Sequence, residues 1–232
     1  MHDETVTTLA QSEEDGYEVA LRRRQRGDQS VDELIINGVF AMDSADPVSE
    51  IALAQALGER PGRVLVAGLG LGYTARQLLA QGVVQLDVVE LSQAMIGWAQ
   101  AGLTDVMRQL ASDPRVHFHH GDVTELLGRQ PGLPGLFGPW DGICLDIDNG
   151  PDFLIHDRNA PLYSLEGLRQ ALSHLTPGGR LALWAQGPSK ELWFDLVALD
   201  PEATEQLVVV DRRNRRIDYA IYSARQNEGR AE

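Results

Sequence analysis

The sequence is poor in cysteine, in long apolar runs and in positive charge, and each shortage excludes a class of protein. The single cysteine, Cys144, excludes an internal disulfide and a cage of thiolate metal ligands, and its apolar neighbours predict a buried core thiol. No apolar run reaches the roughly 18 residues of a transmembrane helix. The acidic first residues lack the basic start and apolar stretch of a signal peptide, so we expect a cytoplasmic protein.

Negative charge exceeds positive charge, with 34 Asp and Glu against 20 Lys and Arg and a formal net charge of −14. Nucleic acids and anionic membranes both attract proteins through a basic face. We therefore expect neither as a partner, and a small or cationic substrate fits this charge better. The one dense basic cluster, Arg22 to Arg26, is typical of a solvated hairpin.

The 232 residues, 43% of them hydrophobic, are enough for one sizeable core and a small appendage. Composition predicts a flexible N-terminus over 1–16 and a β-hairpin element over 17–46. A catalytic domain is expected over 47–226, followed by a flexible tail over 227–232. From Arg63 onward apolar strands alternate with amphipathic helices, which is typical of a parallel sheet covered on both faces.

The fold class predicted is therefore α/β, with a doubly wound seven-stranded sheet. The sheet should be mostly parallel, with an antiparallel C-terminal strand contributed by an edge hairpin. In such sheets the ligand lies beyond the carboxyl ends of the strands, where the strand order reverses. Residues that directly follow each predicted strand are the candidates for function.

The first such segment is the glycine loop VLVAGLGLGYTAR, with Gly68, Gly70 and Gly72. Glycines let the backbone turn sharply and approach a ligand just before a helix begins. The dinucleotide fingerprint requires its third glycine one place later, where this chain has Tyr73. The spacing therefore favours an adenosyl cofactor over a nicotinamide dinucleotide.

Acidic residues follow the next two strands. Glu90, at the end of VVEL, is placed to accept hydrogen bonds from ribose hydroxyls, and a solvated loop acid is the alternative. Asp122, in HHGD, either meets the adenine amino group or caps the next helix, and both roles are compatible. We expect the cofactor contacts to lie in these three segments, at Gly68, Gly70, Leu71, Gly72, Glu90, Leu91, Gly121, Asp122 and Val123, and also at Asp146, which follows a fourth strand.

The loop after the fourth strand, LDIDNGP, contains Asp146, Asp148 and Asn149. A carboxylate beside a sulfonium can orient an amine and take its proton, provided that burial or a like charge raises its pKa. A plain turn is the alternative, since Asp, Asn, Gly and Pro all favour turns. We predict Asp146 as the catalytic residue, with Asp148 and Asn149 contacting the substrate.

These motifs resemble the class I methyltransferase superfamily and, within it, the spermidine synthase-like branch. The resemblance spans roughly residues 31 to 225 and is most specific at VLVAGLGLGYTAR, DPRVHFHHGD, WDGICLDID and LTPGGRLALW. It implies that Asp146 activates the amine, that Glu90 binds ribose and that Asp122 contacts adenine. The implied cofactor is S-adenosylmethionine or its decarboxylated form.

The sequence departs from the polyamine-making members where they bind amines. Leu71 replaces an aspartate of the glycine loop, and Ala41 stands where the family has a glutamine. Val48, Ser49 and Glu50 stand where the family has Tyr-His-Glu. The chain resembles short bacterial proteins that share a DNGPD loop and an Asn-x-x-Leu-Tyr-Ser segment. If residues 149–164 close over the acceptor as a gate, Asn159 and Tyr163 are candidate acceptor contacts, and a plain connecting loop is the alternative.

Two further features carry less weight. His117, His119 and His120 lack a matching set of metal ligands, so no metal is expected. Trp184, at a strand end, is either a core residue or part of the substrate pocket. The partner expected is a small acceptor that carries an amine, and a homodimer is the assembly considered.

The leading hypothesis is methyl transfer from intact S-adenosylmethionine to a small amine, because Leu71 removes the acid that would meet a decarboxylated donor. Aminopropyl or aminocarboxypropyl transfer to an amine, as in polyamine synthesis, is the alternative. A paralogue that binds the cofactor without turnover is the second alternative.

Overall fold

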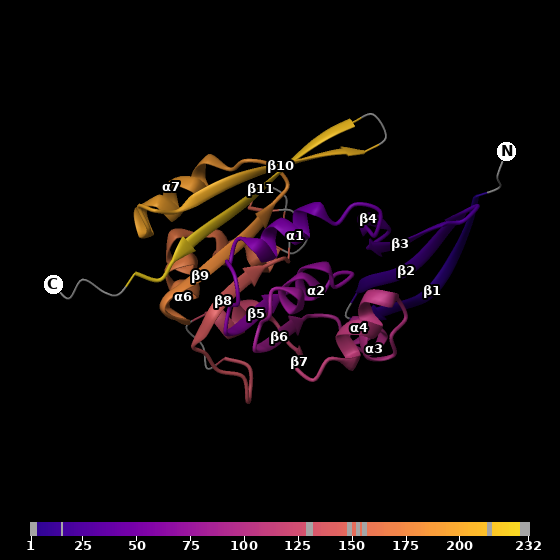
Figure 1. Cartoon of the computed structure of the whole chain (residues 1–232), viewed down its shortest axis with the longest axis horizontal. Helices are drawn as coiled ribbons and strands as arrows, with labels where there is room; N and C mark the ends of the chain where they lie inside the picture. The colour runs from indigo at the N-terminus through magenta and orange to yellow at the C-terminus, as the bar shows by residue number, and fades with distance from the viewer. Residues whose placement is uncertain are drawn as a thin grey trace.

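The structure is a computed structural model that describes residues 4–14, 16–128, 132–147, 150–151, 154, 157–212 and 215–227. Two sheets make up the fold, a four-stranded N-terminal sheet and a seven-stranded sheet that carries the helices. In Figure 1 the indigo N-terminal sheet lies at one end of the molecule, beside the end of the larger sheet that α3 and α4 cover.

The N-terminal sheet is antiparallel throughout, in the order β1-β2-β3-β4. Its strands are β1 (Glu4–Glu14), β2 (Tyr17–Arg26), β3 (Gln29–Ile36) and β4 (Val39–Asp43). The buried side chains of Val19, Leu21 and Leu34 pack against the larger domain, which gives this sheet one apolar face.

This sheet differs from the flexible 1–16 segment and the hairpin over 17–46 that the sequence predicts. Most side chains of β1 are exposed, so they carry no apolar alternation, and the strand is held by its backbone pairing with β2. A break within the predicted hairpin falls at Asn37 and Gly38, which have φ values of 49° and 74°. An Asn-Gly pair of this kind is a signal for a tight turn between strands.

The larger sheet has the order β10-β11-β9-β8-β5-β6-β7, with parallel pairing from β9 to β7 and antiparallel pairing of β9, β11 and β10. This confirms the predicted doubly wound sheet with its antiparallel C-terminal strand. Its strands are β5 (Arg63–Ala67), β6 (Gln85–Glu90), β7 (Val116–His120), β8 (Trp140–Leu145), β9 (Leu175–Ala185), β10 (Thr204–Arg212) and β11 (Arg215–Arg225).

Helices cover both faces of this sheet, as Figure 1 shows. One core joins the sheet to α1, α2, α3, α4 and the N-terminal sheet, and the other joins it to α5, α6 and α7. The helices are α1 (Val48–Gln55), α2 (Tyr73–Ala80), α3 (Gln93–Gln100), α4 (Asp105–Ser112), α5 (Val123–Leu127), α6 (Leu165–Ser173) and α7 (Lys190–Leu199), with a 3-10 helix η1 (Asp157–Tyr163).

The strand order reverses beside β5, the first strand of the larger sheet, which lies between β6 and β8. Its last four residues, 64–67, are buried, as expected for a central parallel strand with an apolar sequence. The crevice at the carboxyl end of β5 is therefore where the fold places a ligand.

No helix in the described part of the chain is both long enough and apolar enough to cross a membrane.

Candidate active site

The functional strand ends lie side by side because the parallel strands end in register. Ala67 pairs with Val89 on one side and with Leu145 on the other. The ladder continues past the strands, since the Gly68 amide donates to the Val89 carbonyl and the Asp146 amide donates to the Ala67 carbonyl, each at 2.9 Å. The glycine loop, Glu90 and Asp146 are thereby brought to one edge of the sheet.

Glu90 is 8% exposed, and its carboxylate is held by the backbone of two loops. Oε2 accepts a 2.9 Å hydrogen bond from the Leu69 amide, and Oε1 accepts a 2.8 Å hydrogen bond from the Ser92 amide. Burial raises the pKa of Glu90, while these amide hydrogen bonds oppose that rise. The carboxylate is therefore fixed directly behind the glycine loop, where the sequence predicts a ribose contact.

Asp122 caps helix α5, which is one of the two roles that the sequence predicts for it. Its Oδ1 accepts hydrogen bonds from the Thr124 amide at 2.8 Å and from the Thr124 hydroxyl at 2.6 Å. Asp122 also lines the pocket together with Gly121, Val123 and Leu91, so the cap leaves the residue at the pocket wall. The contact with adenine stays a prediction.

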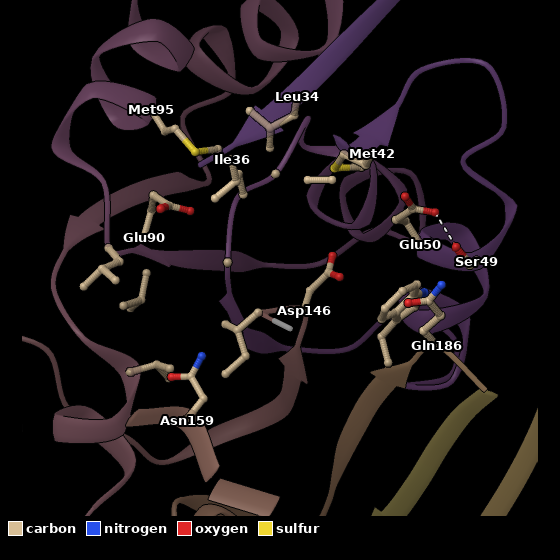
Figure 2. Close-up of a pocket in the computed structure, with 18 of the residues that line it drawn as sticks. Leu34, Ile36, Met42, Ser49, Glu50, Glu90, Met95, Asp146, Asn159 and Gln186 are labelled. Atoms are coloured by element: carbon tan, nitrogen blue, oxygen red, sulfur yellow. Dashed lines mark hydrogen bonds between the residues drawn. The ribbon is translucent and has the colours of Figure 1, made fainter. Parts of the chain in front are cut away.

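Asp146 projects into the middle of the pocket, with Glu90 on one side and Glu50 on the other (Figure 2). The Thr74 hydroxyl donates a 2.7 Å hydrogen bond to Asp146 Oδ2. Burial among protein atoms and the negative charge of Glu50 raise the pKa of Asp146 to about 7, against the opposing effect of Thr74. A carboxylate with this pKa can accept a proton near neutral pH.

Glu50 is a functional candidate that the sequence analysis did not select. It lies in the first turn of α1, is 8% exposed, and accepts a 2.6 Å hydrogen bond from the Ser49 hydroxyl, drawn dashed in Figure 2. Acids are common in first turns of helices and give no signal there. The signal that could have found it is the family comparison, in which Glu50 keeps the glutamate of the Tyr-His-Glu group.

Each glycine of the loop permits a close approach at a positive φ. A Cβ on Gly68 would collide with the Asp146 carbonyl, and one on Gly70 would lie 2.8 Å from Met42 Sδ. A Cβ on Gly72 would lie 2.6 Å from Leu110 Cδ1, so this glycine permits helix packing. Gly68 and Gly70 thus shape the pocket itself.

The pocket has a volume of about 350 Å³ and lies between the larger sheet and the N-terminal sheet. Tyr17, Leu34, Ile36, Phe40 and Met42 contribute an apolar wall from the N-terminal sheet that the sequence analysis did not assign. This sheet is anchored beside the site, because the Glu14 carboxylate accepts hydrogen bonds from the Ser92 hydroxyl at 3.0 Å and the Ala94 amide at 2.9 Å.

Most of the predicted site residues that the structure describes line this single pocket. The exceptions among them are Leu71, Gly72 and Tyr163. Leu71 is 1% exposed and packs in the core, because the left-handed glycines beside it turn the loop so that its side chain is buried. Tyr163 packs in the core on the other face of the sheet.

The remaining substrate candidates lie partly within the described chain. Asn159 is buried and lines the pocket, and Trp184 lines it from the end of β9. Asp148 and Asn149 lie outside the described residues.

Two of the three histidines of β7 have polar neighbours within the protein. His119 Nε2 lies 3.1 Å from Asp87 Oδ1, and His120 Nε2 lies 3.1 Å from the Leu91 carbonyl oxygen. Within the described ranges, no group of three or more His, Cys, Asp and Glu residues is arranged to hold a metal ion.

No family model matches the sequence. The polyamine aminopropyltransferase of Nitrosococcus oceani is 31% identical over 112 residues, which are 48% of this chain. The chain spans only 34% of the length of that relative.

Solved spermidine synthases have the same fold over nearly the whole chain. A spermidine synthase in complex with the transition state analogue AdoDATO matches with a TM-score of 0.70 and 17% identity, over 93% of this chain and 72% of that one. The spermidine synthase of Thermotoga maritima matches with a TM-score of 0.68 and 16% identity, over the same 93% and 72%. A probable spermidine synthase from Corynebacterium glutamicum matches with a TM-score of 0.61 and 18% identity, over 95% and 81%.

The sheet order and the aligned strand ends define a class I methyltransferase-like α/β fold. Within that class the chain has the spermidine synthase-like fold, and it is a homologue of the Nitrosococcus aminopropyltransferase over the matched segment. The resemblance indicated by the sequence motifs is thereby confirmed.

Proposed function

We propose that this chain transfers an aminopropyl group from decarboxylated S-adenosylmethionine to an amine acceptor. Aminopropyl transfer was the alternative in the sequence analysis, and we now prefer it to methyl transfer. It is supported by the homologous aminopropyltransferase and by the charge of the pocket.

The observation that carries the proposal is the acidity of the pocket. Its described lining includes the carboxyl groups of Glu50, Glu90, Asp122 and Asp146, and no Lys, Arg or His among the described residues. Intact S-adenosylmethionine brings a carboxylate into this lining, whereas the decarboxylated form ends in an ammonium group. Opposite charges attract strongly in a pocket with restricted water, so the lining favours the fully cationic donor.

The presence of Leu71 in the glycine loop no longer favours the intact donor. Its side chain is in the core and does not line the pocket, so its apolar character leaves the charge of the pocket unchanged. Glu50 instead supplies a carboxylate near Asp146, as the effect of its charge on Asp146 indicates. An ammonium group of the donor or of the acceptor has an acidic partner there.

The residues present fit an adenosyl donor. The Glu90 carboxylate is held by the Leu69 and Ser92 amides beside the glycine loop, where it can accept hydrogen bonds from a ribose, and Gly68 and Gly70 leave room that a Cβ would fill. When bound, the donor supplies a carbon activated by its positively charged sulfur. Asp146 orients the acceptor amine toward that carbon and accepts a proton from the nitrogen as the new bond forms, while Thr74 holds the other carboxylate oxygen in place.

Parallel calorimetric titrations with S-adenosylmethionine, its decarboxylated form and methylthioadenosine test the proposal. We expect the decarboxylated donor to bind at least about tenfold more tightly than the intact donor, a difference of about 1.4 kcal/mol. Glu50→Gln should reduce this preference. Glu166→Gln, which changes an exposed acid on α6, is the matched control.

Product analysis by mass spectrometry completes the test. With donor and a panel of amines, the acceptor should gain the mass of an aminopropyl group. Tighter binding of intact S-adenosylmethionine together with a methylated product would restore methyl transfer. Donor binding with no modified amine across the panel would favour the cofactor-binding paralogue instead.

A further inference from the structure

The turn between β6 and α3 forms the side of the pocket at Glu90, which we call the donor side. Glu90, Leu91 and Met95 line the pocket from this turn and from the first residues of α3. The Glu90 carboxylate accepts a 2.8 Å hydrogen bond from the Ser92 amide, and the Ser92 hydroxyl oxygen caps α3 by accepting a 3.2 Å hydrogen bond from the Met95 amide. Ser92 therefore helps to fix the positions of both Glu90 and Met95.

Glu14 contacts this turn from a distant part of the chain. It is the last residue of β1 and lies opposite the pocket residue Tyr17 in the pairing of β1 with β2. Its Oε2 accepts a 3.0 Å hydrogen bond from the Ser92 hydroxyl, and its Oε1 accepts a 2.9 Å hydrogen bond from the Ala94 amide. The Ala94 amide belongs to the first turn of α3, where a helix has unsatisfied amide donors and favours a negative charge.

A chain of hydrogen bonds connects Glu14 to Glu90 through Ser92. Because the Ser92 hydroxyl donates its proton to Glu14, its oxygen is free to accept from the Met95 amide. The amide of the same serine donates to Glu90. Burial is the main cause of the raised pKa of Glu90, and the negative charge of Glu14 adds to it, so the two carboxylates are close enough to interact.

The same contact holds the N-terminal sheet against the donor side. Ile36 of β3 packs against the cluster that contains Met95, and Figure 2 shows both residues on the side of the pocket above Glu90. At β4, Met42 Sδ accepts a 3.4 Å hydrogen bond from the Leu71 amide of the glycine loop. The N-terminal sheet is therefore attached to both segments that the proposed donor would contact, the glycine loop and the turn after β6.

Resting on the proposed function, we infer that Glu14 is a positioning residue for the donor. It holds Ser92 where the serine amide orients the Glu90 carboxylate, and it keeps the N-terminal sheet closed over the donor side of the pocket. A carboxylate that is oriented before binding loses less conformational freedom when it accepts hydrogen bonds from the ribose. Glu14 is not among the described residues that line the pocket, so its loss should weaken donor binding without slowing the transfer step at Asp146.

Calorimetry and transfer kinetics with decarboxylated S-adenosylmethionine test this role. We expect Glu14→Ala to raise the Kd and the KM of the donor about fivefold, while kcat and the KM of the amine stay within about twofold of the wild type. Glu14→Gln keeps one acceptor oxygen and should have a smaller effect. Glu13→Ala, which changes the neighbouring exposed acid on the same strand, is the matched control and should bind the donor as the wild type does.

A double-mutant cycle with Ser92→Ala tests whether Glu14 acts through Ser92. The double variant should raise the donor Kd by less than the product of the two single effects, because both changes remove the same hydrogen bond.

Far-UV circular dichroism reports whether each variant is folded, and Glu14→Gln replaces Glu14→Ala in the comparison if the latter unfolds. An unchanged donor Kd, independent effects in the cycle, or a fall in kcat as large as the fall in kcat/KM would each overturn the inference and leave the proposed function standing. If the wild-type chain bound no donor, the inference and the proposed function would fall together.

Discussion

The Thr74 hydroxyl donates a 2.7 Å hydrogen bond to Oδ2 of Asp146, and this bond joins the helix after the glycine loop to the end of β8. Thr74 is 3% exposed, so water has little access to replace the bond. The bond fixes the orientation of the carboxylate and opposes the effects of burial and of Glu50 on its pKa. Two properties of the proposed base, its direction and its acidity, therefore depend on one hydroxyl.

Replacing Thr74 by Val removes the hydroxyl and keeps the shape. We expect kcat/KM for transfer to fall by about tenfold, because a buried hydrogen bond to a charged group contributes about 1.5–3 kcal/mol. The pKa of Asp146, already raised to about 7, should rise further, since Thr74 lowers it. In a pH profile of kcat/KM, the midpoint of the rising limb should move to higher pH. Thr74→Ser keeps the hydroxyl and should retain both rate and midpoint, so equal losses in Ser and Val variants would contradict this role.

Asp146→Asn should lower the transfer activity and raise the stability of the folded protein at high pH. We expect transfer to fall by about 100-fold or more, because the amide cannot accept the proton of the amine. Asp146 has a raised pKa in the folded state, so its ionised form destabilises the folded protein. This destabilisation is absent below the unfolded pKa of about 3.9, grows as pH rises, and is complete above the folded pKa of about 7.

Thermal unfolding without donor measures this effect. The Tm of Asp146→Asn should exceed that of the wild type at pH 8, with little difference near pH 4. Glu166→Gln, an exposed acid on α6, should show no such pH-dependent gain. A lower Tm for Asp146→Asn at pH 8 would mean that the carboxylate stabilises the fold.

Glu90→Gln should weaken donor binding. The carboxylate accepts hydrogen bonds from the Leu69 and Ser92 amides and lines the pocket. A neutral amide would accept weaker hydrogen bonds from the ribose hydroxyls than the charged carboxylate does. We expect the calorimetric Kd of the decarboxylated donor to rise about tenfold or more. Glu14→Gln, which alters the neighbouring contact to Ser92 and Ala94, is the comparison variant and should have a smaller effect.

Asp87 belongs to a buried network in the sheet that takes no part in the site. Its carboxylate accepts hydrogen bonds from Arg63 Nε at 2.8 Å and Trp140 Nε1 at 3.0 Å, and it lies 3.1 Å from His119 Nε2. Burial alone would raise the pKa of Asp87, but the hydrogen bonds of His119, Trp140 and Gln85 and the charge of Arg63 lower it.

Asp87→Asn should lower the free energy of unfolding by about 1–3 kcal/mol at pH 7. Because the folded pKa of Asp87 is depressed, its stabilisation is present above the unfolded pKa of about 3.9 and is lost as pH falls toward the folded pKa. Urea unfolding at pH 7 and pH 3 should therefore show a smaller difference between variant and wild type at pH 3. The affinity for the donor should stay unchanged. If a fully folded Asp87→Asn variant bound the donor more weakly, the Asp87 network would contribute to the site.

The sequence by itself determined the larger sheet and the edge at which the site lies. Alternating apolar strands and helices leave few arrangements of a parallel sheet, and parallel strands bring their carboxyl ends to one edge. Glu90, Asp122 and Asp146 could be found for this reason, since each directly follows an apolar strand. Cys144 was placed in the core by its apolar neighbours, where the structure has it buried.

Only the tertiary structure decided which other residues meet those acids. Glu50 and Thr74 reach Asp146 from α1 and α2, and Met42 reaches the glycine loop from the N-terminal sheet. Leu71 belongs to the glycine loop in sequence but to the core in space. Periodicity reports which face of an element is buried, but it carries no information on which distant side chain faces it across a pocket, because that depends on how whole elements pack.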